Sequence, residues 1–307
     1  MKKLLFLAIG AILLVQTAPV LADPVQPKSF AQWCQQKSSV PTATRHTINV
    51  LLKKAGTNNC QKANSKLSTI NKIEISGEQI QDLKPLANLN KLTELNLSGN
   101  QIQDLKPLVK LFNLTNLSLD TNQISDLKPL ANLSKLTKLN LSRNQLQDLK
   151  PLVKLNKLIN LSLDTNQISD LKPLANLSKL TEIDLGSNQL QDLKPLVKLN
   201  KLTNLSLDTN QISDLKPLAN LSKLTYLTIA RNKLNDITPL ASLNNLTRLI
   251  LCYNQISNLK PLSGLNKIID LDLSNNQISN VMPLTNLEGL VFLKIQNNPS
   301  IELKGGR

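Results

Sequence analysis

An aliphatic residue returns every 22 positions over most of this chain, and that period constrains the fold more than any other feature. Three stretches of 21 residues, at 117–137, 161–181 and 205–225, are identical letter for letter and lie 44 positions apart. A unit this short cannot bury its own leucines and must stack on its neighbours, so the sequence predicts an elongated solenoid. The eleven repeat positions are Ile70, Leu92, Leu114, Leu136, Leu158, Leu180, Leu202, Leu224, Leu246, Ile268 and Leu290.

Each unit predicts a strand, a turn and a short helical segment, as residues 92–113 illustrate. Leu95 and Leu97 alternate with polar residues, which is the pattern of a strand with one buried face. Asn100 follows where the strand must turn, and its amide can satisfy backbone groups of neighbouring coils. The segment Asp-Leu-Lys-Pro-Leu predicts a 3₁₀ or α turn, because aspartate accepts backbone N–H groups and proline suits an early helical position. Its leucines then close the core from the side opposite the strand.

The complete unit, L-x-x-L-x-L-x-x-N-x-I-x-D-L-x-P-L-x-x-L-x-x, resembles the leucine-rich repeat in the 22-residue form of the bacterial internalins. The resemblance implies an α/β solenoid, a horseshoe with a concave parallel β-sheet, short 3₁₀ or α turns on the convex side and an N-terminal helical cap. It also implies a non-enzymatic scaffold that binds a protein partner on the concave face. We assign residues 70–307 to this solenoid, with eleven repeats of which the last is truncated.

The N-terminus is typical of an exported protein. Lys2 and Lys3 precede an apolar run that is too short for a membrane span, and small residues follow up to Ala22. We predict a signal peptide over residues 1–22, with a signal anchor as the alternative that Pro19 disfavours. Because no second apolar stretch follows, we expect a secreted or periplasmic protein without a transmembrane anchor.

Residues 23–69 differ in texture from the repeats and predict a linker followed by a helical cap over the first coil. Phe30, Trp33 and Cys34 have helical spacing, and Trp33 is expected in the core of the cap. A second helix is expected to end at Gly56, and a third to start near Asn59.

The three cysteines predict one disulfide and one remaining thiol. Cys34 and Cys60 share the cap segment, and export favours an oxidising compartment, so we predict that these two are bridged. Cys252 then remains, either as a small hydrophobic residue or as a reactive or intermolecular thiol.

The sequence offers no pattern that predicts an enzyme, a cofactor or a metal ion. His46 is the only histidine, and we expect it to be a solvated residue of a cap helix. A glycine-rich phosphate loop is missing, and a unique catalytic centre would rarely survive copying of identical blocks. The paired carboxylates Glu182 and Asp184 are interpreted as acidic surface.

The formal charge of +15 is unevenly distributed. The residues that flank the inward leucines of the eleven strands include six basic and nine acidic side chains, so the concave face is acidic. This argues against nucleic acid as the partner of the sheet, because phosphate contacts need clustered cations. The convex lysines, such as Lys106 and Lys110, instead suggest an alternative function, adhesion to an acidic cell-envelope polymer or an anionic membrane surface. Solubility alone also explains them.

Aromatic residues concentrate in the last four repeats at concave positions. Stacking the units places Tyr226, Arg248, Asp270 and Phe292 in one row. Arg231 and Tyr253 fall in a second row, and Ile250 lies exposed between the two. Tyrosine and arginine are enriched in interface hot spots, so these seven residues are the predicted partner-binding set. Sequence drift in older terminal repeats, with the aromatics packed only on their arginine neighbours, is the alternative.

Two further expectations concern single columns of the repeat. Asp120, Asp164 and Asp208 occur on every second strand, and we expect Arg143 and Arg231 on the intervening strands to be their partners. Such aspartates are about 9–10 Å apart, too far to share a metal ion. Nothing like the N-terminal cap follows the last repeat, so its strand near Leu293 is expected to be open to another chain.

Overall fold

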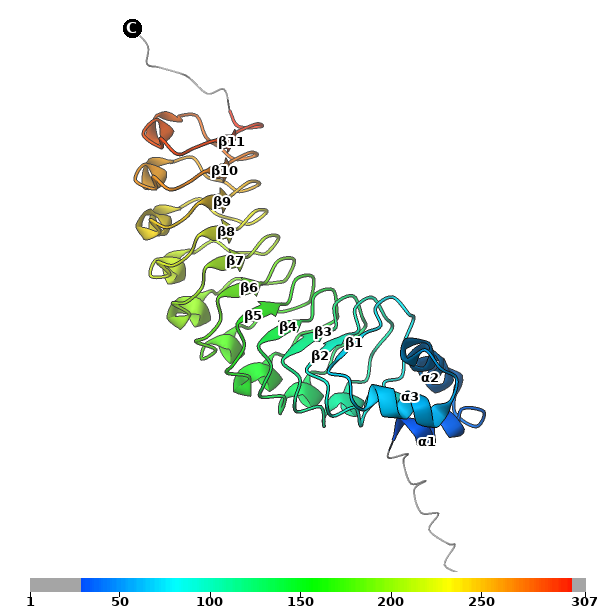
Figure 1. The fold of residues 1–307 in the computed structure, drawn as a ribbon. Helices are drawn as coiled ribbons and strands as arrows, with labels where there is room; N and C mark the ends of the chain where they lie inside the picture. The colour runs from blue at the N-terminus through cyan, green and yellow to red at the C-terminus, as the bar shows by residue number, and fades with distance from the viewer. Residues whose placement is uncertain (1–28, 300–307) are drawn as a thin grey trace, which may run out of the picture.

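The computed structural model describes residues 29–299 as a curved solenoid with a helical cap at its N-terminal end (Figure 1). The predicted fold class is confirmed. Eleven strands form one parallel sheet in chain order, and each connects to the next through a 3₁₀ turn on the outer, convex side. The strands are β1 (Lys72–Glu74), β2 (Glu94–Asn96), β3 (Asn116–Ser118), β4 (Lys138–Asn140), β5 (Asn160–Ser162), β6 (Glu182–Asp184), β7 (Asn204–Ser206), β8 (Tyr226–Thr228), β9 (Arg248–Ile250), β10 (Asp270–Asp272) and β11 (Phe292–Lys294).

The convex turns form where the sequence predicts them. In eight of them the 3₁₀ turn begins at the lysine of the Asp-Leu-Lys-Pro-Leu motif or its Asn-Leu-Lys-Pro-Leu variant, and an Asp or Asn two residues earlier accepts the N–H of that lysine, as Asp104 Oδ1 does from Lys106 at 2.9 Å. The turns are η1 (Lys84–Leu86), η2 (Lys106–Leu108), η3 (Lys128–Leu130), η4 (Lys150–Lys154), η5 (Lys172–Leu174), η6 (Lys194–Lys198), η7 (Lys216–Leu218), η8 (Thr238–Ser242), η9 (Lys260–Leu262) and η10 (Met282–Leu284).

A continuous leucine and isoleucine core fills the space between the sheet and the turns. Leu95 and Leu97 are 2% and 0% exposed, and Leu108 on the opposite side is fully buried. Every coil adds the same layer, so burial of these side chains is the main stabilising contribution and depends on the next coil being present.

The predicted asparagine ladder joins successive coils. Asn122 Nδ2 donates to the carbonyl of Leu97 in the preceding coil at 3.0 Å and to that of Leu119 in its own coil at 3.0 Å. Its Oδ1 accepts the backbone N–H of Ile102 at 3.0 Å. The amide thereby satisfies buried backbone groups that no strand partner reaches, which confirms its structural role.

A left-handed backbone residue precedes each ladder asparagine from Asn100 onward. Gly99 adopts this conformation without cost, but Thr121 at φ 57° and Thr165 at φ 53° are β-branched residues that disfavour it. The stacking of identical coils therefore imposes the turn against local preference. The side chains at these positions are aligned along one edge of the sheet.

Three helices make up the cap, as predicted: α1 (Phe30–Gln35), α2 (Thr42–Ala55) and α3 (Cys60–Leu67). Gly56 ends α2 in the left-handed conformation, and the side chain of Asn59 caps the N-terminus of α3. Cys34 and Cys60 form the predicted disulfide between α1 and α3. Trp33 is 7% exposed and belongs to the core of the cap.

The cap docks on the first coil through polar contacts around a buried apolar centre. Thr47 Oγ1 donates to the carbonyl of Asp82 at 2.7 Å, and Thr44 Oγ1 donates to the Asp82 carboxylate. His46 is exposed, as expected, and its Nε2 contacts the carbonyl of Glu78, the residue that replaces the ladder asparagine in the first repeat.

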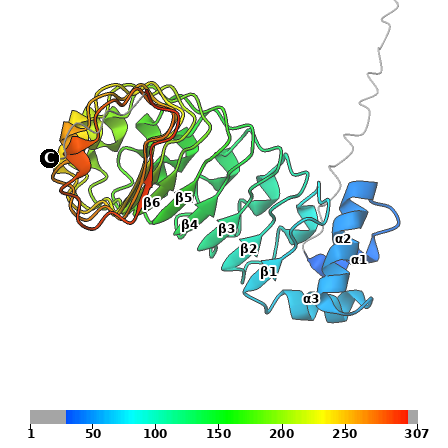
Figure 2. The same cartoon turned by 90° about the horizontal axis from the view of Figure 1, so that it is seen from above.

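The helical cap lies against the N-terminal end of the solenoid (Figure 2). The last strand, β11, is more exposed than the strand before it. Leu293 of β11 is 39% exposed, whereas the equivalent Leu271 of β10 is fully buried. The predicted signal peptide over residues 1–22 lies outside the described residues. Among the residues described, no helix has the length and apolarity required to cross a membrane.

Candidate functional site

Strand register places the first predicted row of concave side chains on four adjacent strands. Tyr226 pairs with Arg248, Arg248 with Asp270, and Asp270 with Phe292. In β8, β9 and β10 the central residue is buried while the first residue points away from the core. The row therefore runs along the concave surface at the C-terminal end of the sheet.

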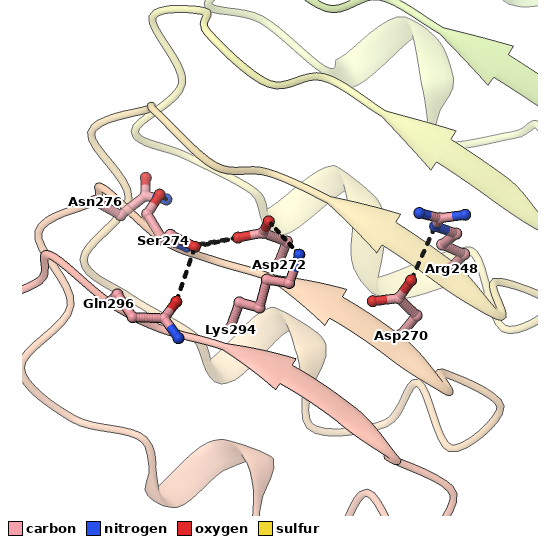
Figure 3. Close-up of polar contacts among 7 residues, drawn as sticks. All are labelled: Arg248, Asp270, Asp272, Ser274, Asn276, Lys294 and Gln296. Atoms are coloured by element: carbon pink, nitrogen blue, oxygen red, sulfur yellow. Dashed lines mark hydrogen bonds and ion pairs between the residues drawn. The ribbon is translucent and has the colours of Figure 1, made fainter.

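Arg248 connects the middle of this row. Its Nε lies 2.9 Å from Asp270 Oδ2, and its guanidinium carbon lies 5.5 Å from the centroid of the Tyr226 ring (Figure 3 draws the ion pair). The two contacts hold the planar guanidinium between an anion and an aromatic face. Burial raises the pKa of the Tyr226 phenol, and nearby carboxylates including Asp208 add to this effect. The phenol is therefore a hydrogen-bond donor at neutral pH.

The second row lies beside the first, at the left-handed turn positions. Arg231 and Tyr253 have φ values of 56° and 58°, and the Arg231 guanidinium carbon lies 4.1 Å from the centroid of the Tyr253 ring. Tyr253 is 44% exposed in spite of this stacking. Two arginine–aromatic pairs thus occur within two neighbouring coils, and Ile250 lies partly exposed on β9 between Arg248 and Tyr253.

A polar network on β10 and β11 completes the C-terminal end of the concave face (Figure 3). Asp272 accepts the N–H of Ser274 at 3.0 Å and also its hydroxyl, and Lys294 Nζ lies 4.0 Å from Asp272 Oδ2. Ser274 Oγ is 3.4 Å from Gln296 Oε1. The predicted set omits these residues. Pairing each strand with the next in register would have found the opposition of Asp272 and Lys294.

Similarity searches agree with this geometry. A family model described as leucine-rich repeats in two copies matches residues 90–132, 112–154, 134–176 and 178–220. An internalin (inlF) from Listeria monocytogenes is 34% identical, with a TM-score of 0.79, over 82% of this chain and 75% of that one. This chain belongs to the internalin-like leucine-rich repeat proteins. The predicted family is thereby confirmed.

Other solved structures extend the comparison. Internalin C2 from the same organism is 31% identical over 80% of this internalin-like chain and 91% of that one, with a TM-score of 0.52. The functional domain of the Listeria monocytogenes internalin InlJ shares the fold at 23% identity, with a TM-score of 0.66, over 88% of this chain and 61% of that one. No curated protein sequence matched the chain.

The aspartate column of this internalin-like chain has partners other than those predicted. Asp120 Oδ1 accepts the hydroxyl of Ser98 at 2.6 Å, and Asp208 Oδ1 accepts the N–H of Ala230 at 2.6 Å and the hydroxyl of Thr228. No ion pair within residues 29–299 joins the column to an arginine. The expected arginine partnership was wrong, because hydroxyl and amide groups of the adjacent coils lie closer to the carboxylates than the arginine side chains do.

The remaining thiol is not activated. Cys252 is free and half-buried, and burial raises the pKa of its thiol, with further contributions from Asp272 and Asp208. A raised pKa keeps the sulfur protonated at neutral pH and lowers its nucleophilicity. The arrangement favours the interpretation of Cys252 as a small apolar residue.

The hollow part of the concave surface lies over the N-terminal and central strands. One hollow runs from Lys72 on β1 to Ser162 on β5, and a second runs from Asn160 to Tyr226 on β8. Its lining mixes asparagine and serine side chains, such as Ser118, with charged and aliphatic residues. Tyr226 is the predicted contact residue that borders this hollow, and the other six are absent from both linings.

The concave carboxylates do not assemble a metal site. Within the described residues, no group of three or more His, Cys, Asp and Glu side chains has a metal-binding arrangement. The concave face instead presents an ion pair, two arginines stacked on tyrosine rings and exposed aromatic side chains.

Proposed function

We propose that this chain is a non-enzymatic scaffold, secreted or periplasmic, that binds a protein partner on the C-terminal third of its concave sheet. One observation carries the proposal: Tyr226, Arg248, Asp270 and Phe292 occupy one continuous row on four neighbouring strands. Arginine and tyrosine that are already held in place lose little conformational entropy when they bind, and both types are enriched in hot spots.

The exposure of two aromatic side chains supports the same region as the binding site. Phe292 is 62% exposed and Tyr253 is 44% exposed, beside the charged pair of Arg248 and Asp270. An aromatic side chain that remains accessible next to fixed charges provides apolar area to bury together with a polar group that selects orientation. The disulfide and the family membership support export.

Alanine substitution tests the proposal. The native partner is first captured with residues 23–307 as bait, and dissociation constants are then measured for Tyr226→Ala, Arg248→Ala and Tyr253→Ala. Each change is expected to weaken binding by about 1–3 kcal/mol, about 5- to 150-fold in Kd, because it removes an anchoring side chain.

Ser118→Ala and Ser162→Ala are the matched controls, since both residues lie on the same sheet in the N-terminal hollow. We expect them to leave Kd within twofold of wild type, and thermal unfolding of all variants should report intact folds. Equal losses for the serine and the aromatic variants would show a contact spread over the whole sheet and contradict the proposal.

A further inference from the structure

The positive charge that is not balanced by carboxylates lies outside the turn motif of the convex side. The turn motif contributes eight aspartates, from Asp82 to Asp236, and eight lysines, of which seven lie from Lys84 to Lys216 and the eighth is Lys260. The two columns lie two residues apart and cancel in formal charge. The lysines of this motif are therefore offset by neighbouring carboxylates.

A different column carries lysines without acidic counterparts. It occupies the loop between each 3₁₀ turn and the following strand, and from Lys91 to Gly289 it contains seven lysines, two asparagines and one glycine. Five of the lysines fall on consecutive coils. We call these five the lysine flank: Lys135, Lys157, Lys179, Lys201 and Lys223.

The flank is a single file of exposed ammonium groups. All five side chains are exposed, and within residues 29–299 none forms an ion pair with a carboxylate. Two residues beyond Lys135, Thr137 N donates to Thr115 O at 2.8 Å, so neighbouring coils remain in ladder contact here. With about 4.8 Å between strands, five consecutive positions span about 19 Å.

Two lysines of this column, Lys135 at the start of the flank and Lys267 beyond it, have a side-chain partner on the preceding coil that the interior of the flank lacks. Lys135 Nζ donates to Asn113 Oδ1 at 2.7 Å, and Lys267 Nζ donates to Asn245 Oδ1 at 2.8 Å, because in both cases the preceding coil carries asparagine at the same position. From Lys157 to Lys223 the preceding coil carries another lysine instead. Like charges thus face one another along the file, and an external anion would relieve their repulsion.

We propose that the lysine flank binds a linear phosphate polymer laid along the solenoid axis. The file follows the stacking direction over five coils, which suits an extended polymer better than a planar membrane surface. It contains lysine and no arginine, and the ammonium group interacts with phosphate as a point charge without demanding a fixed geometry. This function lies outside the concave partner site and is independent of it.

The test measures binding of long-chain inorganic polyphosphate to residues 23–307 as a function of salt concentration. Five phosphate contacts predict a slope of about −3.5 for the logarithm of the association constant against the logarithm of salt concentration, using about 0.7 per contact for a single-stranded polyanion. Affinity should therefore fall about 100-fold between 50 and 200 mM salt.

Two variants of equal net charge isolate the flank. The first changes Lys135, Lys157, Lys179, Lys201 and Lys223 to glutamine, and it should lose at least tenfold in affinity and most of the salt slope. The second changes five lysines of the turn motif, Lys106, Lys128, Lys150, Lys172 and Lys194, to glutamine and should bind like wild type. Thermal unfolding verifies that both variants fold.

Each other outcome overturns the proposal. Equal loss in the two variants would show attraction by net charge alone, and absence of polyphosphate binding at 50 mM salt would show that the flank is a solvated surface. Anionic vesicles that bind as tightly as polyphosphate, with the same dependence on the flank, would make it a membrane-binding surface. Arg248→Ala should leave polyphosphate binding unchanged, so failure here is distinguishable from failure at the concave face.

Discussion

The pKa of Asp208 depends on burial and on the carboxylates of the preceding coils. Burial raises the pKa of this carboxyl, and the charges of Asp184 and Asp164 add to the effect, while hydrogen bonds from Thr228 and Ala230 oppose it. A pKa above the unfolded value means that protonation of Asp208 favours the folded state. Its contribution to stability is therefore complete below the ordinary pKa of aspartate and is lost as pH rises through the raised value.

We expect Asp208→Asn to stabilise the protein at pH 7, because Asn Oδ1 can accept the same two hydrogen bonds without the charge. The free energy of unfolding in urea, measured from pH 3 to pH 7, should exceed that of wild type by a margin that shrinks towards pH 3. Asp192→Asn is the control, since Asn258 already fills the equivalent place in a later turn. A margin independent of pH would contradict the electrostatic explanation.

At the scale of elements, the cap depends on its covalent link. The disulfide joins α1 to α3 across a sequence separation of 26 residues, and closing a loop of that length stabilises by about 3.5 kcal/mol in the chain-entropy model. Cys34→Ser combined with Cys60→Ser should therefore lower the unfolding free energy of the cap by about 2–5 kcal/mol. Hydrogen exchange of α1 and α2 amides would measure this loss, with Cys252→Ser expected to leave those amides unchanged.

Thiol titration checks the same link independently. Unfolded, unreduced protein should expose one thiol, that of Cys252, and three thiols would show that the cysteines of the cap are not bridged. In the native state, the raised pKa of Cys252 predicts a slow reaction with thiol reagents at neutral pH.

At the scale of the whole molecule, the central coils and the last coil differ in how much a leucine contributes to the free energy of unfolding. Leu161 and Leu293 occupy the same repeat position, yet they are 1% and 39% exposed. Leu161→Ala should cost about 2–5 kcal/mol of unfolding free energy, as a buried leucine does, and Leu293→Ala about 1 kcal/mol or less. Urea unfolding measures both, and equal costs would show that the last coil is covered as completely as the central ones.

The structural features that follow from the 22-residue period could be predicted from the sequence alone. Strands, turns and the asparagine ladder follow from alternation and motif spacing, and the cap followed from helical spacing together with two cysteines in one segment. The partners of Asp120 and Asp208 did not follow, because they depend on which hydroxyl and amide groups of the neighbouring coils reach the carboxylate. The left-handed backbone of the threonines could not be predicted from local preferences either, because the stacking of coils overrides the preference of a β-branched residue.

The identical stretches at 161–181 and 205–225 make length an adjustable property of this molecule. Removing residues 161–204 would join Asn160 to Leu205, a junction with the same letters as the present one, and the coil that begins at Leu224 would meet the same sequence as now except for Ile159 in place of Thr203. The solenoid would become two coils shorter, about 10 Å along its axis, and Tyr226 would move that much closer to the cap. The number of repeated blocks thus sets the distance between the cap and the C-terminal row that begins at Tyr226.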